Sequence, residues 1–198
     1  MSIKRPEVVI MAGPNGSGKS TYTEQIGIIK PYINADDLKR TTHCTDKEAA
    51  EKSDELRRQA IKQGIDFSFE TVLSSRYKFE LLKELYKNNY FIRCYYFLTK
   101  DPNINLVRVN ARVAQGGHDV PPDRIKSRYD KCLHLLPQII QMCDVCNIYD
   151  NTVELDRIFK KRKDEYFRWK NEYWSLSDIE NLTKITQYTS YRKVNGHI

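Results

Sequence analysis

The run VVIMAGPNGSGKST, residues 8–21, constrains the fold of this chain more than any other part of the sequence. A glycine, four intervening residues and then Gly18-Lys19-Ser20 form the pattern of a P-loop, which lies between a short apolar run and the expected start of a helix. Backbone N–H groups of such a loop, with the positive end of the helix dipole, surround the phosphates of a nucleotide. The run therefore predicts a buried strand, a phosphate-binding loop and a helix of an α/β fold.

Two side chains of the loop have separate expected roles. We expect Lys19 to place a positive charge on the outer phosphates, and Ser20 to ligate Mg²⁺ through its hydroxyl. The predicted nucleotide-binding set is the loop together with one arginine from later in the chain: Gly13, Pro14, Asn15, Gly16, Ser17, Gly18, Lys19, Ser20, Thr21 and Arg128.

Length and composition favour one globular domain. The 198 residues are 40% hydrophobic, which is enough for a core, and no run approaches the roughly 18 apolar residues of a membrane span. The N-terminus leads straight into a strand without a small-residue cleavage site, so we expect a soluble, cytoplasmic protein with no membrane partner.

The five cysteines are odd in number and scattered, which favours reduced thiols over a disulfide framework. Cys143 and Cys146 do form a C-x-x-C. Because the sequence has no second pair and no nearby histidine at finger spacing, we do not favour zinc or redox chemistry there.

Apolar and amphipathic segments alternate along the chain in the rhythm of βα units. After the first strand the pattern predicts strands over 31–35, 65–70, 90–98 and 143–150 and helices over 45–63, 75–88, 101–115 and 122–141. The fold class is thus α/β, a parallel sheet of about five strands flanked by helices. We expect a core over 1–151 and, over 152–198, a basic helical extension packed on the same domain.

The segment RIFKKRKDEYFRWK, residues 157–170, holds seven of the 33 basic residues, with aromatic residues between them. The chain has a net charge of +7, which suits nucleic acid or an anionic small molecule. The segment could stack bases and bind phosphates. We favour a solvated helix whose apolar side chains partly pack on the core: Ile158, Phe159, Tyr166, Phe167 and Trp169.

Accessory motifs narrow the class of P-loop protein. A GTPase should carry D-x-x-G and N/T-K-x-D; the first is absent, and Thr99-Lys100-Asp101 lacks the spacer of the second. A transport-type ATPase needs a serine-glycine signature and a long apolar strand ending in Asp-Glu, and the chain has neither. A compact phosphotransferase remains.

Two acidic residues stand at the ends of predicted strands, where parallel sheets form their ligand crevice. Asp36 follows the second strand and is the candidate for orienting or deprotonating an acceptor hydroxyl. The alternative for Asp36 is a helix N-cap, a role that suits Asp37 better. Glu70 ends the third strand and could bind substrate hydroxyls, hold Mg²⁺ through water, or pair with a lysine.

Four arginines suggest a lid over about 104–130. Arg108 and Arg112 are four residues apart on one expected helix, Arg124 and Arg128 on the next, and Gly116-Gly117 lies between as a hinge. We expect two of the four to contact phosphate and the others to be solvated or paired with acids. His118 either contacts phosphate in a closed lid or caps the next helix.

Five segments in order, GPNGSGKST, INADDL, FSFETVLSS, DPNINLVRVNARVAQGGHDVP and IKSRY, resemble the zeta-toxin family of P-loop kinases. The likeness is to its small chromosomal members, sometimes labelled predicted ABC-type ATPases, and covers residues 7–151. It implies an adenylate-kinase-like sheet with a helical lid, the cofactors ATP and Mg²⁺, a small-molecule acceptor such as the 3′-hydroxyl of UDP-N-acetylglucosamine, and an antitoxin as a partner.

The resemblance also assigns roles to residues. It implies Asp36, Lys19 and Arg112 as catalytic residues, Ser20 as the metal ligand and Glu70 as a substrate-binding residue. The predicted substrate-binding set is Asp36, Glu70 and Arg76.

The chain departs from the family at two places. Asn34-Ala35-Asp36 replaces Asp-x-Asp, and Glu70-Thr71-Val72-Leu73-Ser74 replaces Glu-Gly-Thr-x-Arg, so the base is kept while the pocket changes. Two other functions stay open: a polynucleotide 5′-hydroxyl kinase, which the basic segment motivates, and a non-catalytic ATP-binding or regulatory module.

Overall fold

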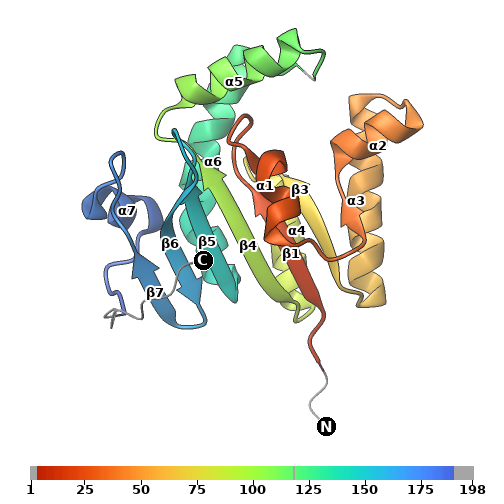
Figure 1. Ribbon diagram of the computed structural model, residues 1–198. Coiled ribbons are helices and arrows are strands. Elements are labelled where there is room, and N and C mark those ends of the chain that lie inside the picture. The colour runs from red at the N-terminus through yellow and green to blue at the C-terminus, as the bar shows by residue number, and fades with distance from the viewer. Residues whose placement is uncertain (1–3, 118, 190–198) are drawn as a thin grey trace.

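Strand β1 (Glu7–Ala12) lies inside a seven-stranded sheet of order β2-β3-β1-β4-β5-β6-β7 (Figure 1). The computed structural model describes residues 4–117 and 119–189. The five parallel strands that the sequence predicts are confirmed: β1, β2 (Tyr32–Ile33), β3 (Phe67–Thr71), β4 (Phe91–Leu98) and β5 (Val145–Asp150). Because all five run the same way, their carboxyl ends meet at one edge of the sheet.

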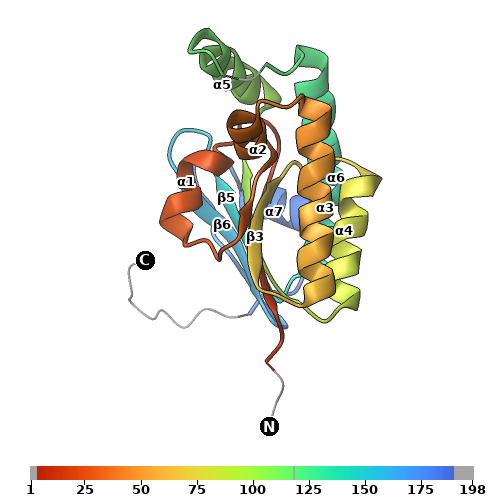
Figure 2. The ribbon, with the colours of Figure 1, turned by 90° about the vertical axis from the view of Figure 1, so that its right-hand side faces the viewer.

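Helices cover both faces of the sheet (Figure 2). On one face α1 (Lys19–Ile26) packs over Val9 and Met11. The opposite face, which carries Val8 and Ile10, is covered by α3 (Asp46–Gln63), α4 (Arg76–Lys87), α6 (Pro122–Met142) and α7 (Leu176–Thr183). Neighbouring residues of β1 face two different cores in alternation, which explains why the strand is continuously apolar after Glu7.

Local capping signals begin three helices where the sequence predicts them. Thr45 and Glu48 form a reciprocal capping box at α3, and Ser75 accepts the N–H of Lys78 at α4. Asp101 caps α5 (Pro102–Ala114), which has proline in its first turn. Side-chain oxygens satisfy N–H groups that have no partner within the helix, so these boundaries follow from local chemistry.

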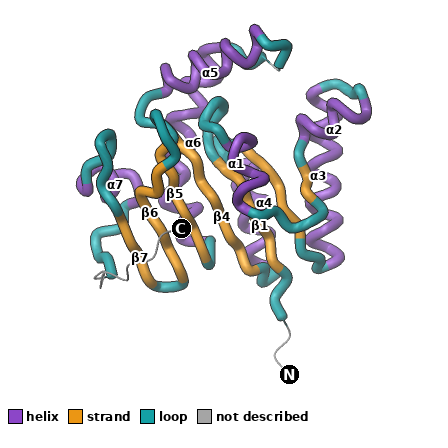
Figure 3. The backbone as a smooth tube through the Cα atoms, viewed as in Figure 1, coloured by secondary structure: helices purple, strands orange, loops and turns teal. Residues whose placement is uncertain are grey.

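An unpredicted helix follows the second strand (Figure 3). The strand ends at Ile33, and α2 (Ala35–Thr42) begins two residues later. Its N-cap is Asn34, whose side-chain oxygen accepts the N–H of Asp36 at 2.8 Å. The assignment of Asp37 as the better cap was therefore wrong, because the side chain of Asn34, three residues earlier, caps the helix.

The predicted helical form of the basic segment was also wrong. Residues 156–168 form a hairpin of β6 (Asp156–Arg162) and β7 (Glu165–Arg168), in which β6 pairs antiparallel with β5 and β7 pairs antiparallel with β6. Ile158 and Phe159 are fully buried, so the expected packing of these two residues on the core is confirmed although the element is not. The edge of β5 supplies backbone partners that a sequence pattern cannot reveal. Residues 190–198 of the extension lie outside the described residues.

Helix α5 stands beyond the carboxyl ends of the strands (Figure 1). Together with the first turns of α6 it encloses a small apolar core of its own, formed by Val109, Val120 and Ile125. Gly116, after α5, has φ 83°, a left-handed conformation that favours glycine. The predicted role of His118 lies outside the described residues. Among residues 4–117 and 119–189, no helix has the length and apolarity needed to cross a membrane.

Candidate active site

The P-loop joins β1 to α1 and is packed tightly against its neighbours. A Cβ atom at Gly13, where φ is 139°, would lie 2.0 Å from the carbonyl oxygen of Phe97. At Gly18, where φ is 91°, a Cβ would lie 2.2 Å from Nδ2 of Asn151. Both glycines are therefore required by the backbone conformation and by close approach.

Two asparagines that the sequence analysis missed hold the loop from outside. The Asn105 amide donates to the carbonyl oxygen of Asn15 at 2.6 Å, and the Asn151 amide donates to that of Ser17 at 2.9 Å. Asn151 directly follows β5, so its place at the strand end was an available signal. Asn105 lies inside α5 and offered no comparable signal. These bonds fix the backbone that is expected to cradle phosphates.

Lys19 lies inside this loop and is 6% exposed. Its Nζ donates to the carbonyl oxygens of Gly13 at 3.0 Å and Pro14 at 2.9 Å, and lies 4.0 Å from Oε1 of Glu70. Burial lowers the pKa of Lys19, and the nearby charge of Glu70 acts in the opposite direction. An anionic ligand beside Nζ would stabilise the charged form further.

Glu70 connects the loop to the second strand. Its Oε2 accepts the Ser20 hydroxyl at 3.0 Å and the Tyr32 hydroxyl at 3.3 Å. Burial, followed by the charge of Glu70, raises the pKa of Tyr32 to about 12. This carboxylate therefore contacts the predicted metal ligand and lies near the P-loop lysine, so the pairing with a lysine considered from the sequence occurs together with a bond to Ser20.

Asp36 lies in the first turn of α2 and is exposed to the cleft. It lies close enough to Lys19 for its negative charge to raise the pKa of that ammonium, although burial, the largest effect, lowers that pKa overall. Asn34 fills the N-cap position of α2, so Asp36 is not the helix cap.

One cleft of about 820 Å³ brings most of the predicted site together. The predicted residues that line it are Asn15, Gly16, Gly18, Lys19, Ser20, Thr21, Asp36, Glu70, Arg112 and Arg128. Gly13, Pro14 and Ser17 are buried in the loop and do not line it. Arg76 lines a separate hollow with Asp130 and His134, which meets the cleft at Ser75 and Lys131.

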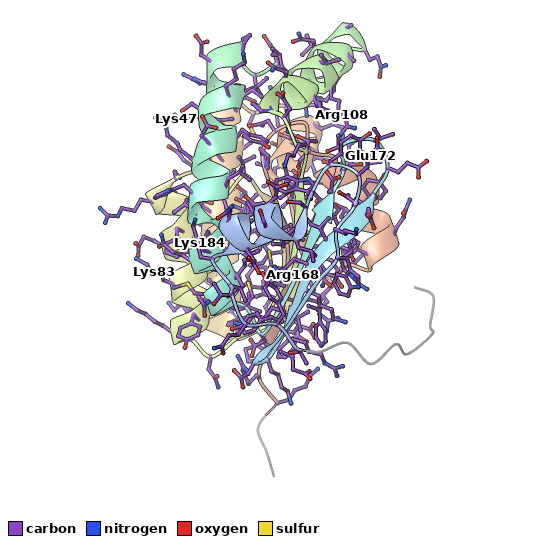
Figure 4. All side chains as sticks on the ribbon, turned by 90° about the vertical axis from the view of Figure 1, so that its left-hand side faces the viewer. Lys47, Lys83, Arg108, Arg168, Glu172 and Lys184 are labelled. Atoms are coloured by element: carbon purple, nitrogen blue, oxygen red, sulfur yellow. The ribbon has the colours of Figure 1, made fainter. Side chains whose placement is uncertain are left out.

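The lid arginines differ in what they contact. Arg128 donates to Oδ1 of Asn15 at 3.1 Å, so it reaches the P-loop itself. Arg108 donates to the carbonyl oxygens of Asn151 at 2.7 Å and Thr152 at 3.1 Å, which ties α5 to the end of β5 (Figure 4). Arg112 lines the cleft and is exposed, whereas Arg124 does not line it.

The opposite wall of the cleft holds a charged cluster that the sequence analysis missed. Arg57 is buried in α3 and donates to Oδ1 of Asp54 at 2.7 Å, and Lys78 donates to the same oxygen at 2.9 Å. Arg57 shares the buried face of α3 with Ala49 and Ser53. Arg57 follows Ala49 and Ser53 at four-residue spacing, so the sequence places it on the buried face of the helix. A buried arginine needs a partner, and this position could therefore have been predicted as paired or functional.

The cleft suits a phosphorylated ligand. Cationic side chains lining the cleft outnumber carboxylates: Lys19, Arg57, Lys78, Arg108, Arg112, Arg128 and Lys131 against Asp36, Asp46 and Glu70. The Ser20 hydroxyl at the start of α1 is of the donor type that P-loops offer to Mg²⁺. The residues present therefore fit both a nucleotide and its metal ion.

Comparison with known proteins gives a family match and a relative in sequence. The family model described as Zeta toxin matches residues 29–171. An uncharacterized protein of Haemophilus influenzae is 32% identical over 133 residues, which cover 64% of this chain and 95% of that protein.

Solved structures share the fold at low identity. The AvrRxo1-ORF1:ORF2 complex with ATP has a TM-score of 0.69 at 14% identity, covering 98% of this chain and 66% of that one. The PezAT toxin-antitoxin system of Streptococcus pneumoniae has a TM-score of 0.58 at 15% identity, covering 93% and 86%. The Pnkp1/Rnl/Hen1 RNA repair complex has a TM-score of 0.53 at 19% identity. The match covers 67% of this chain and 46% of that one, so this chain spans less than half of that protein.

Proposed function

Because this chain belongs to the zeta toxin family, we propose that it is an ATP- and Mg²⁺-dependent kinase that phosphorylates a hydroxyl of a small molecule. The observation that carries the proposal is that Lys19 and Ser20 share one cleft with Asp36 and Glu70. A nucleotide-binding loop and carboxylates that face the same space are what transfer to an acceptor requires.

The P-loop side of the cleft would hold the donor. The N–H groups of the loop bind the phosphates, and Lys19 exchanges its carbonyl partners for phosphate oxygens. The Ser20 hydroxyl would hold Mg²⁺, which would supply positive charge to neutralise the outer phosphates. Glu70, which accepts that hydroxyl at 3.0 Å, would release it and become available for water molecules around the ion. Arg128 approaches from α6 through its contact with Asn15.

Transfer would proceed by direct displacement. The acceptor oxygen attacks the γ-phosphorus, a new oxygen–phosphorus bond forms, and the bond to the bridging oxygen of ADP breaks. Asp36 takes the proton of the acceptor hydroxyl. Arg112 stabilises the charge that develops on the transferred group.

The acceptor side of the cleft favours a polar, anionic molecule. Arg57 and Lys78 line it from α3 and α4, and Lys131 from α6. A UDP-N-acetyl sugar, with its diphosphate and sugar hydroxyls, fits this chemistry and is the acceptor that we propose. By the same resemblance, we propose a protein antitoxin as the partner that regulates the enzyme; the PezAT neighbour is a chromosomal toxin–antitoxin system.

One observation favours a polynucleotide 5′-hydroxyl acceptor as the second candidate. The β6–β7 hairpin places Arg157, Lys160 and Arg162 close together. The pKa of Lys160 is lowered by burial and then by the charges of Arg157 and Arg162, as expected for cations that crowd one surface. Such a surface would bind a phosphate backbone.

Mass spectrometry distinguishes these functions. The protein is incubated with Mg-ATP and a panel of UDP-sugars, free sugars, nucleosides and 5′-hydroxyl oligonucleotides, with Lys19→Ala as the control. We expect a UDP-N-acetyl sugar to gain one phosphate, only with intact Lys19. A phosphorylated oligonucleotide would select the second candidate. If ADP and free phosphate are the only products, the protein is an ATPase and the proposed kinase activity is rejected. If nucleotide binds without turnover, the protein is a non-catalytic ATP-binding module.

A further inference from the structure

Three cysteines from separate elements meet in the core, away from the cleft. Cys94 lies on β4, and its partner in the parallel register is Cys146 on β5. Cys143 follows the last residue of α6. All three are buried, and their Sγ atoms lie within 4.8 Å of one another. The sequence offered only the C-x-x-C pair, because Cys94 comes from a strand about 50 residues earlier.

A buried cation lies beside these sulfurs. Lys161 on β6 is 7% exposed, and its Nζ donates to the carbonyl oxygens of Ile140 at 2.9 Å and Gln141 at 3.1 Å, at the end of α6. The positive charge of Lys161 acts to lower the pKa of both Cys143 and Cys146. Carbonyl groups are neutral, and a buried ammonium is costly without a negative charge nearby. A thiolate in this cluster would supply that charge.

The three thiols are not equivalent. Hydrogen bonds from Cys143 and then from Cys94, together with the charge of Lys161, hold the pKa of Cys146 well below its usual range, although burial opposes them. The pKa of Cys94 is raised well above its usual range, by its bonds to Cys143 and Cys146 and by burial. Of the three thiols, Cys146 is thus the one whose surroundings most favour the thiolate, which is the form that binds metal ions.

We propose that Cys94, Cys143 and Cys146 form a binding site for a thiophilic, closed-shell metal ion, and that Zn²⁺ is the occupant. A zinc–sulfur bond is about 2.3 Å long, so three sulfurs around one ion stand roughly 4 Å apart. The spacing of the cluster needs only a slight closure to meet this geometry. Thiolate ligands select Zn²⁺ and Cu⁺ over ions that prefer oxygen ligands.

Charge favours Zn²⁺ over Cu⁺. Three thiolates and the ammonium of Lys161 leave a net charge that a divalent cation cancels, whereas Cu⁺ would leave one negative charge in the core. Each cysteine that enters as a thiol forms a sulfur–metal bond and releases its proton to solvent, with no change in oxidation state. The ion would join β4, β5 and the end of α6. None of these cysteines lines the cleft, so the site does not depend on the proposed kinase activity.

Refolding the full chain tests the site, because metal then has access before the core closes. The chain is refolded under anaerobic, reducing conditions without metal, with Zn²⁺ or with Cu⁺, passed through a chelator, and measured for bound metal and melting temperature. We expect about one Zn²⁺ per chain and a higher melting temperature than for the metal-free protein. Retention should be lost in Cys94→Ser, Cys143→Ser and Cys146→Ser and kept in the control Cys44→Ser.

Three results would overturn the proposal: no metal retained by the wild type, equal retention after removal of any of the three sulfurs, or a disulfide within the cluster in the reduced protein. Retention of Cu⁺ but not Zn²⁺ would keep the site and reject the occupant. If the serine variants do not fold, the wild type is refolded with Cd²⁺ and its absorption spectrum is recorded. Sulfur-to-cadmium charge-transfer absorption is expected, and its absence would show that the thiolates are not ligands.

Discussion

The Ser20 hydroxyl donates to both carboxylate oxygens of Glu70, at 3.1 Å from Oε1 and 3.0 Å from Oε2. The two residues come from positions 50 apart in the chain and meet because β1 and β3 are parallel neighbours, with Met11 opposite Glu70. The side chain expected to ligate Mg²⁺ is therefore already bound by a carboxylate, and metal binding must replace that bond.

Glu70→Gln should separate nucleotide binding from transfer. The amide keeps the shape but removes the negative charge that faces Ser20 and Lys19, so we expect phosphate binding to persist and acceptor phosphorylation to fall about 10²-fold or more. Calorimetry with Mg-ATP and a phosphorylation assay measure the two effects. Glu84→Gln, whose native carboxylate pairs with Arg58 outside the cleft, is the control. Unchanged transfer in Glu70→Gln would remove this residue from the site.

Asp36→Asn tests the proposed role of Asp36 as the general base, with the neighbouring Asp37 as the comparison. We expect nucleotide binding to be kept and transfer to fall by about 10²–10⁴-fold, because an amide cannot accept the proton of the acceptor. Asp37→Asn is the matched control, since Asp37 pairs with Arg40 and does not line the cleft. Steady-state kinetics of both variants give the comparison, and equal rates would reject the assignment of Asp36.

Arg112→Ala should lower kcat with little change in melting temperature, because Arg112 is exposed on the cleft side of α5. An arginine that stabilises transferring phosphate contributes about 10³-fold or more. Arg124→Ala, which alters an exposed arginine away from the cleft, is expected to stay near the wild-type rate. A smaller effect in Arg112→Ala than in Arg124→Ala would contradict the role.

Asp54→Asn should destabilise the fold by about 3 kcal/mol, because it leaves the buried Arg57 without its carboxylate. Burial raises the pKa of Asp54, but the hydrogen bond and charge of Lys78 and the charge of Arg57 outweigh it and lower the pKa overall. The stabilisation is thus present above the unfolded-state pKa of about 4 and is lost as the pH falls through the lower folded-state value.

Urea unfolding of Asp54→Asn and the wild type at several pH values checks this expectation. The difference between the two proteins should be largest near neutral pH and shrink below pH of about 4. The control is Glu55→Gln, an exposed neighbour paired with Lys52, for which we expect a change under about 0.5 kcal/mol. A difference that stays constant down to acidic pH would show that the charge of Asp54 is not what stabilises Arg57.

Sequence patterns were reliable where the cause of a structure is local. The capping box at Thr45 and the Asp101-Pro102 start of α5 act through bonds within three residues, and both helices begin where expected. The second strand was predicted to reach residue 35 but ends at Ile33, because Asn34 caps a helix there and the sequence analysis did not recognise that cap. In the basic segment the turn at Lys163, with φ 56°, lacks the glycine or asparagine that usually marks a hairpin.

The sequence by itself determined the P-loop, the parallel βα order, and the acidic residues that follow β2 and lie near the end of β3, because each rests on spacing within a short segment. Only the tertiary structure decided which side chains meet across long separations: Glu70 with Ser20, Asn151 with the loop, Asp54 with Arg57 and Lys78 on the acceptor wall, and Cys94 with Cys143 and Cys146. The physical reason is that strand pairing and helix packing set these contacts, and both depend on which edge and which face the rest of the chain leaves available.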